Sequence, residues 1–76
     1  MRSKDRLVEV MRSVNPHLNY IAHVVMTAAA AHIEEEAGDC PACFFNMREI
    51  ATKEVSPHLR ELAQEALIYL ECGGAA

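Results

Sequence analysis

Residues 56–74 read SPHLRELAQEALIYLECGG, and this stretch predicts an amphipathic helix with a defined beginning and end. Ser56 is a good N-cap, Pro57 suits the first helical position, and Gly73-Gly74 is a natural stop. Between them, apolar side chains recur at the three- and four-residue spacing that places them on one helix face. The members of this stripe are Leu59, Leu62, Ala63, Ala66, Leu67 and Leu70. Such a helix needs a neighbour to cover that face.

Residues 16–37 predict a second, longer helix with a broader apolar surface. It has the same kind of start, because Asn15 stands before Pro16. Its main stripe consists of Leu18, Ile21, Ala22, Val25, Ala28, Ala29 and His32. Val24, Met26 and Ala31 extend the apolar surface well beyond that stripe. A helix with so much apolar surface requires neighbours on several sides.

Two shorter helices complete the predicted fold. Ser3 can cap a first helix, Gly38 can end the second, and Asp39 or Cys40 can cap a third that has Pro41 in its first turn. The apolar faces are Leu7, Val10, Met11 and Val14 in the first helix and Phe44, Met47, Ile50 and Ala51 in the third. No segment alternates as a strand does. We therefore expect an all-α fold, a small bundle of three to four helices arranged as two helical hairpins.

One short pattern occurs twice in the chain. Residues 14–22 read VNPHLNYIA and residues 55–63 read VSPHLRELA, with the Val, Pro, His, Leu and final Ala in common. Two interpretations stay open. Both helices can simply use the same favourable start signal, or the chain can contain a duplicated helical hairpin with pseudo-twofold symmetry.

The chain is short for its apolar content. Its 76 residues favour one helical domain over residues 1–76. A domain of this size buries only roughly 60% of its unfolded surface, yet 51% of these residues are hydrophobic. We therefore expect dimerisation to complete the core. The interface candidates are Ile21, Val25, Ala28, Ala29, Leu62 and Leu67.

Charge and composition exclude several classes of partner. The net charge is -4, and two Tyr, two Phe and no Trp leave little for stacking on bases, so nucleic acid is not an expected partner. Glu9 and Arg12 interrupt any signal-peptide core. The apolar-rich run of residues 20–33 is shorter than the roughly 20 residues of a membrane span. We expect a cytoplasmic protein without membrane contact.

Cys40-Pro41-Ala42-Cys43 is the one motif with chemical potential. At a helix start, both sulfurs face the positive end of the helix dipole and its free N–H groups. That environment favours the thiolate, which is the form that attacks disulfides and binds metals. In a reducing compartment the three cysteines favour metal, redox chemistry or plain burial over a structural disulfide.

Three families share parts of this motif. The string is similar to the Cys-Pro-x-Cys of glutaredoxins, which implies dithiol chemistry, but the βαβ pattern of their α/β fold is missing. It also resembles the metal knuckles of rubredoxins and zinc ribbons, although Phe44 stands where those usually have glycine. An alanine-rich helix before the motif resembles the alkylhydroperoxidase-like helical family, whose following His is absent. Each resemblance covers a small part of the chain and assigns no family.

A metal site is the alternative use of these thiols. Tetrahedral zinc needs four ligands, and a second Cys-x-x-Cys is missing. The candidate ligands are Cys40 and Cys43, supplemented by His32, His58 or Cys72, for zinc or iron. His32 is the best placed of these, in the last turns before the cysteine loop. Ordinary burial of a histidine and bystander roles for His58 and Cys72 are the simpler explanations.

No catalytic triad, phosphate loop or nucleotide fingerprint is present, so a conventional enzyme is not expected. The favoured function is a small interaction or regulatory module that self-associates. The alternative is a thiol protein in which Cys40 and Cys43 bind metal or exchange disulfides. A weaker alternative is an acidic inhibitor that docks residues 34–36 and Asp39 on a basic protein surface.

Overall fold

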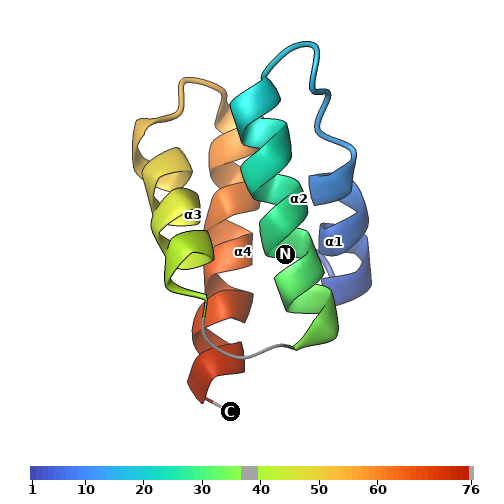
Figure 1. Cartoon of the computed structure of the whole chain (residues 1–76), viewed down its shortest axis with the longest axis vertical. Helices are drawn as coiled ribbons and strands as arrows, with labels where there is room; N and C mark the ends of the chain where they lie inside the picture. Colours follow the sequence, from blue (N-terminus) through green and yellow to red (C-terminus); the bar gives the residue numbers. More distant parts are fainter. Residues whose placement is uncertain (37–39, 76) are drawn as a thin grey trace.

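The computed structural model describes residues 1–36 and 40–75 of the chain, with side chains as far as residue 70. Four helices follow one another: α1 (Lys4–Arg12), α2 (Tyr20–Glu35), α3 (Pro41–Lys53) and α4 (Pro57–Ala75). They run alternately up and down in a bundle of 34 × 21 × 21 Å (Figure 1). No strand occurs in the two described ranges. The all-α prediction is confirmed.

The helices form the two predicted hairpins. α1 packs against α2, and α3 packs against α4. α2 also contacts α3 and α4, and α4 contacts α1, which closes the four helices around one core. The α1–α2 loop (13–19) and the α3–α4 loop (54–56) lie at the same end of the bundle, with the N-terminus of α3 at the other end (Figure 1).

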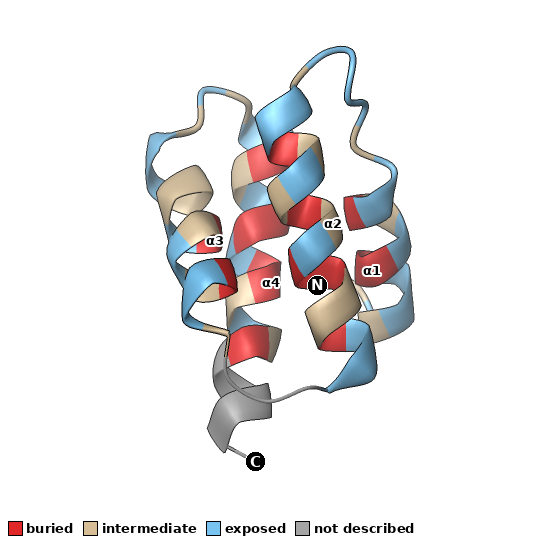
Figure 2. Ribbon diagram, in the orientation of Figure 1, coloured by how far each residue is buried: buried red, intermediate tan, exposed pale blue. Residues whose placement is uncertain are grey.

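Methionine, leucine and alanine side chains fill the core. The largest fully buried side chains are Leu7, Met11, Met26, Met47 and Leu62. Buried alanines lie on α2 and α4, and the buried positions of these helices form the inner faces of the bundle (Figure 2). Every residue of the predicted α4 stripe is buried except Leu67, which is half-buried. The burial pattern of α4 was thus predictable from its spacing.

The start of α2 differs from the prediction. Asn15-Pro16 forms only a turn, in which the Asn15 side chain accepts a hydrogen bond from the backbone N–H of His17. The helix begins at Tyr20, because Asn19 adopts an extended backbone and its side chain accepts from the N–H of Ala22. Asparagine is a preferred N-cap at either position, so the sequence offers two start signals in tandem.

The buried face of α2 also differs in part from the predicted stripe. The buried side chains are Ala22, Met26, Ala29, Ala30 and Ile33. Ile21 of the predicted stripe is 74% exposed, Ala28 is exposed, and Leu18 lies in the loop at 86% exposure. The predicted stripe is confirmed at Ala22 and Ala29 and wrong at Leu18, Ile21 and Ala28. The surface of this helix is apolar nearly all round, so spacing alone does not select the inward face.

The other helix boundaries agree with the sequence in part. Ser3 caps α1 and accepts from the N–H of Arg6, and Ser56 accepts from the N–H of Leu59 at the start of α4. α4 continues to Ala75, so Gly73-Gly74 does not end it, because glycine also adopts the right-handed helical conformation. The predicted stop at Gly38 and the alternative cap Asp39 lie outside the described residues.

Two ion pairs tie the acidic end of α2 to α1. Arg12 bonds Glu34 in a bidentate geometry, and Lys4 bonds Glu36 at 3.0 Å. Carboxylates are unfavourable at a helix C-terminus, and these cations offset that cost. The hydrogen bond from Arg12 lowers the pKa of Glu34, and the same contact raises the pKa of Arg12.

Candidate functional site

Cys40 stands at the N-cap of α3, as one of the two predicted alternatives placed it. Its backbone is not helical, and Pro41 occupies the first helical position. The backbone N–H of Cys43 donates to Cys40 Sγ at 3.2 Å, in the way that a capping oxygen accepts at other helix starts. A sulfur in this position is held against the positive end of α3, which favours its thiolate form.

Cys40 and Cys43 are joined by a disulfide across this first turn, with their Cα atoms 5.2 Å apart. The sequence left their bonding open and favoured burial, metal or redox chemistry over a structural disulfide. A bond between residues so close in the chain closes a short loop and removes less entropy from the unfolded chain than a long-range disulfide does. Cys43 is 8% exposed, whereas Cys40 is half-buried, so Cys40 is the less buried of the two.

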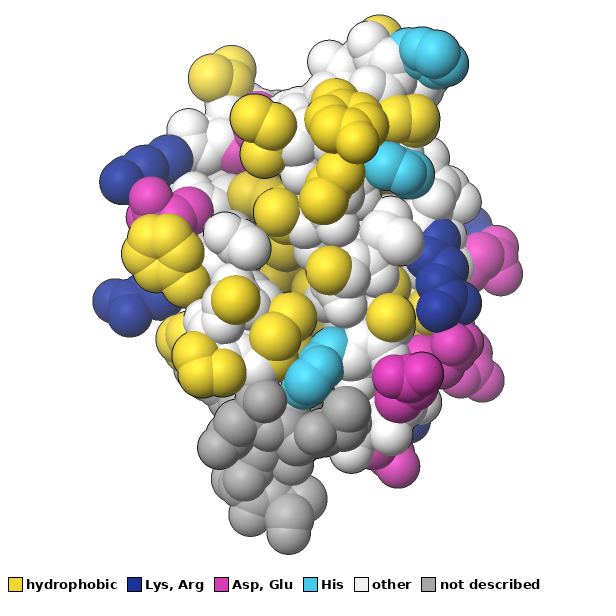
Figure 3. Space-filling model, viewed as in Figure 1, with side chains coloured by type: hydrophobic (Ala, Val, Ile, Leu, Met, Phe, Trp, Pro, Cys, Tyr) yellow, Lys and Arg dark blue, Asp and Glu magenta, His cyan; other side chains and the backbone are white. Residues whose placement is uncertain are grey.

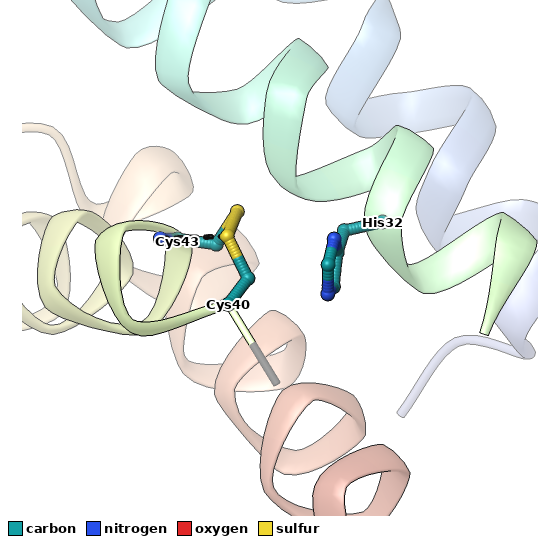
Figure 4. Close-up of side chains that lie close together, drawn as sticks. All are labelled: His32, Cys40 and Cys43. Carbon is teal, nitrogen blue, oxygen red and sulfur yellow. Dashed lines mark hydrogen bonds between the residues drawn. A yellow bond between two sulfur atoms is a disulfide. The ribbon is translucent and has the colours of Figure 1, made fainter. Parts of the chain in front are cut away.

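His32 completes a three-residue cluster. It lies in the last turn of α2, and its imidazole extends towards the two sulfurs at the start of α3 (Figure 4). One donor atom from each of His32, Cys40 and Cys43 lies within 4.8 Å of the others. The antiparallel packing of α2 and α3 explains this, since it brings the end of one helix beside the beginning of the next.

Two further residues, His58 and Cys72, were predicted as candidate ligands, and neither belongs to this cluster in the described part of the structure. His58 lies at the start of α4, beyond the far end of α3, and about 15 Å of helix separates that end from Cys43. His58 lines a groove at the loop end of the bundle instead. The structure therefore does not bring His58 together with Cys40 and Cys43, because α3 and α4 run antiparallel. The Cys72 side chain lies outside the described part of the structure.

The α1–α2 and α3–α4 loops border a groove that the sequence analysis did not predict. Its volume is about 570 Å³, and its lining combines both copies of the repeated pattern, including Val14, Leu18, Val55, His58 and Leu59. The repeat was the signal that could have located it, because equivalent loops of two hairpins meet at one end of a bundle. Its polar groups are engaged locally: Asn15 bonds His17, and Ser56 caps α4.

The predicted interface residues separate into three groups by burial. Ala29 and Leu62 are fully buried in the core of this chain, Val25 and Leu67 are half-buried, and Ile21 and Ala28 are exposed. Hydrophobic side chains gather over α2 and α3 on the face shown in Figure 3. Further large apolar side chains exposed on these helices are Tyr20, Val24 and Phe45.

The acidic residues near the cluster are held by α1. Glu34 and Glu36 pair with Arg12 and Lys4, so much of their charge is balanced within the chain. This pairing weakens the idea of an acidic inhibitor surface, because a partner's cations would have to replace existing ones. It also keeps these two carboxylates engaged with α1 rather than with the sulfurs of α3.

Comparisons with known proteins gave no match: no protein-family model fits the chain, and neither a curated protein nor a solved structure is significantly similar to it. No helix in the described residues is long and apolar enough to cross a membrane. The chemistry of His32, Cys40 and Cys43 therefore has to be argued from their geometry alone.

Proposed function

We propose that this protein is a thiol–disulfide exchange protein whose reactive pair is Cys40 and Cys43. The observation that carries the proposal is the disulfide across the first turn of α3, with the less buried Cys40 as N-cap and Cys43 behind it. A pair in which one cysteine is less buried than the other suits sequential attack. The helix N-terminus supplies the electrostatic stabilisation that a reactive thiolate needs.

The reaction follows from this difference in exposure. In the reduced protein, the Cys40 thiolate attacks a disulfide R–S–S–R′, forms a mixed disulfide with one sulfur and releases R′–S⁻. Cys43 then loses its proton and attacks Cys40 Sγ, which forms the internal disulfide and releases R–S⁻. Two electrons pass from the protein to the substrate disulfide, and the two thiol protons of the protein accompany them.

His32 is suited to assist both steps. Its imidazole lies beside both sulfurs, within the 4.8 Å that encloses the three donor atoms. A neutral imidazole can accept the thiol proton, and the resulting cation then stabilises the thiolate next to it. His32 therefore complements the N–H of Cys43, which already donates to Cys40 Sγ.

Thiol trapping after equilibration with reduced and oxidised glutathione tests the proposal. Cys72→Ser should be the background, so that only the two motif cysteines are counted by alkylation and mass spectrometry. We expect Cys40 and Cys43 to oxidise together, reversibly. With Cys43→Ser added, Cys40 should form a glutathione mixed disulfide at least about 10-fold faster than Cys43 does in the matched Cys40→Ser protein. Thiols that stay reduced in oxidised glutathione would refute exchange.

Self-association is a second candidate function, and the exposed apolar face of α2 and α3 supports it. Ile21 and Phe45 are 74% and 61% exposed, which is unusual for such large apolar side chains in one small domain. Ile21, Val25 and Ile50 also line a depression of about 140 Å³ between the two helices. A second copy of the chain is the proposed occupant, because its own α2–α3 face offers the same apolar side chains.

A further inference from the structure

We propose that the reduced protein binds one zinc ion through His32, Cys40 and Cys43, so that the dithiol is also a redox-controlled metal site. The inference deepens the proposed function and rests on it in one respect: the disulfide must be reducible in the folded chain. It differs in requiring His32 as a direct ligand. The two activities can therefore fail separately.

The distances fit a tetrahedral ion. With Zn–S bonds of about 2.3 Å and Zn–N bonds of about 2.0–2.1 Å, neighbouring ligand atoms in a tetrahedron lie about 3.4–3.8 Å apart. The nitrogen of His32 and the two sulfurs already lie within 4.8 Å of one another. Reduction frees the sulfurs to separate by side-chain rotation, while α2 and α3 keep their positions. Two cysteines separated by two residues is also a usual spacing for zinc ligands.

The donor set selects the kind of metal. Two thiolates and one imidazole suit zinc and other soft or borderline ions, whereas magnesium and calcium require oxygen ligands. Two thiolate charges neutralise Zn²⁺, which suits the half-buried position of Cys40 and the burial of Cys43. The nearby carboxylates Glu34 and Glu36 are engaged by Arg12 and Lys4. The site is therefore built of sulfur and nitrogen.

Three protein ligands leave the fourth coordination position for water or an external thiol, as in zinc sites that exchange ligands. Oxidation then releases the ion. A disulfide R–S–S–R takes two electrons from the zinc-bound thiolates, Cys40 and Cys43 form their mutual bond, Zn²⁺ leaves, and two protons from solvent complete two R–SH. The opposite reaction, reduction followed by zinc binding, returns those protons to solvent because the ligands bind as thiolates.

Titration of the reduced full-length chain with Co²⁺, followed by displacement with Zn²⁺, tests the site. We expect one Co²⁺ per chain, with thiolate-to-cobalt charge transfer and the intense visible bands of tetrahedral coordination. Cys40→Ser and Cys43→Ser should abolish these bands. Substitution of a residue that only supports a metal ligand weakens metal affinity about 10- to 100-fold. Because His32→Ala removes a direct ligand, we expect it to weaken Co²⁺ affinity by at least that factor. His58→Ala is the matched histidine control and should bind as the unchanged chain does.

Two further measurements keep the outcome decisive. Circular dichroism of His32→Ala must show the helical content of the unchanged protein, so that lost binding is not lost folding. Oxidised glutathione should release bound Zn²⁺ in proportion to the disulfide formed. Cobalt binding that survives His32→Ala, or that disappears with Cys72→Ser alone, would overturn this ligand set. If exchange with glutathione proceeds but no tetrahedral cobalt spectrum forms, the zinc site is refuted and the exchange function stands. If cobalt binds but no exchange occurs, the exchange function is refuted and the metal site stands.

Discussion

At the residue scale, Glu65 shows how a long-range contact secures the fold. Its buried carboxylate accepts hydrogen bonds from the backbone N–H and the guanidinium of Arg2, at 2.9 and 2.5 Å. The hydroxyl of Tyr69 donates to the carbonyl of Arg2, 3.3 Å away. Together these bonds fasten the N-terminal segment to α4.

Glu65→Ala should therefore lower the free energy of unfolding by about 1–3 kcal/mol, because it leaves the N–H and the guanidinium of Arg2 without their acceptor. Glu61→Ala is the matched control. Glu61 is 65% exposed and 4.0 Å from Arg2, so its removal should change stability by less than about 0.5 kcal/mol. Urea denaturation of both variants measures the difference. Equal midpoints for the two would show that the buried pair contributes nothing specific.

Contacts between individual residues were predictable from the sequence only where the residues lie close together along the chain. Cys40 and Cys43 share one helix turn, so their spacing gave both the motif and its capping position. His32 was selected because the last turns of one helix lie near the start of the next. The partners Arg2 and Glu65 are 63 residues apart, and no pattern in the sequence connects them. His58 has the residue type of a metal ligand, but it lies at the opposite end of the bundle from the cysteines, which the sequence pattern does not show.

At the element scale, the two asparagines before α2 have different roles. Asn19 satisfies the N–H of Ala22 inside the first turn of the helix, whereas Asn15 stabilises an exposed loop turn. Asn19→Ala should therefore cost about 0.5–2 kcal/mol, the usual loss for an N-cap. Asn15→Ala should cost less than about 0.5 kcal/mol. Thermal or urea unfolding of the matched pair measures this, and a larger loss at Asn15 would mean that α2 starts at Pro16.

The same pair explains why helix boundaries were less predictable than helices. Periodic apolar residues are numerous enough to establish that a helix exists over residues 20–35. The first residue of the helix depends on whether Asn15 or Asn19 acts as the N-cap. Tertiary contacts decide between these two asparagines. Here His23 of α2 lies with its Nδ1 2.7 Å from the carbonyl of Val14, which ties the helix to the preceding loop.

At the scale of the whole molecule, the bundle and its hairpins followed from four periodic segments joined by short breaks. The packing of these helices leaves apolar surface uncovered, with Ile21, Phe45 and the depression beside Val25 on α2 and α3. A single chain of this size cannot place every large side chain inside. That geometric limit is the physical reason for expecting a second copy against this face.

Light scattering over a dilution series tests that expectation. Ile21→Lys places a charge in the proposed interface, and the isolated fold should tolerate it because Ile21 is 74% exposed. We expect at least about a 10-fold weaker dimer, since full burial of an isoleucine contributes about 1.5–3 kcal/mol. Val55→Lys is the control: Val55 is 86% exposed but lies in the α3–α4 loop beside the groove. If the protein is a monomer at every concentration, the dimer is excluded. If Val55→Lys weakens the dimer and Ile21→Lys does not, the interface lies at the loop end of the bundle instead.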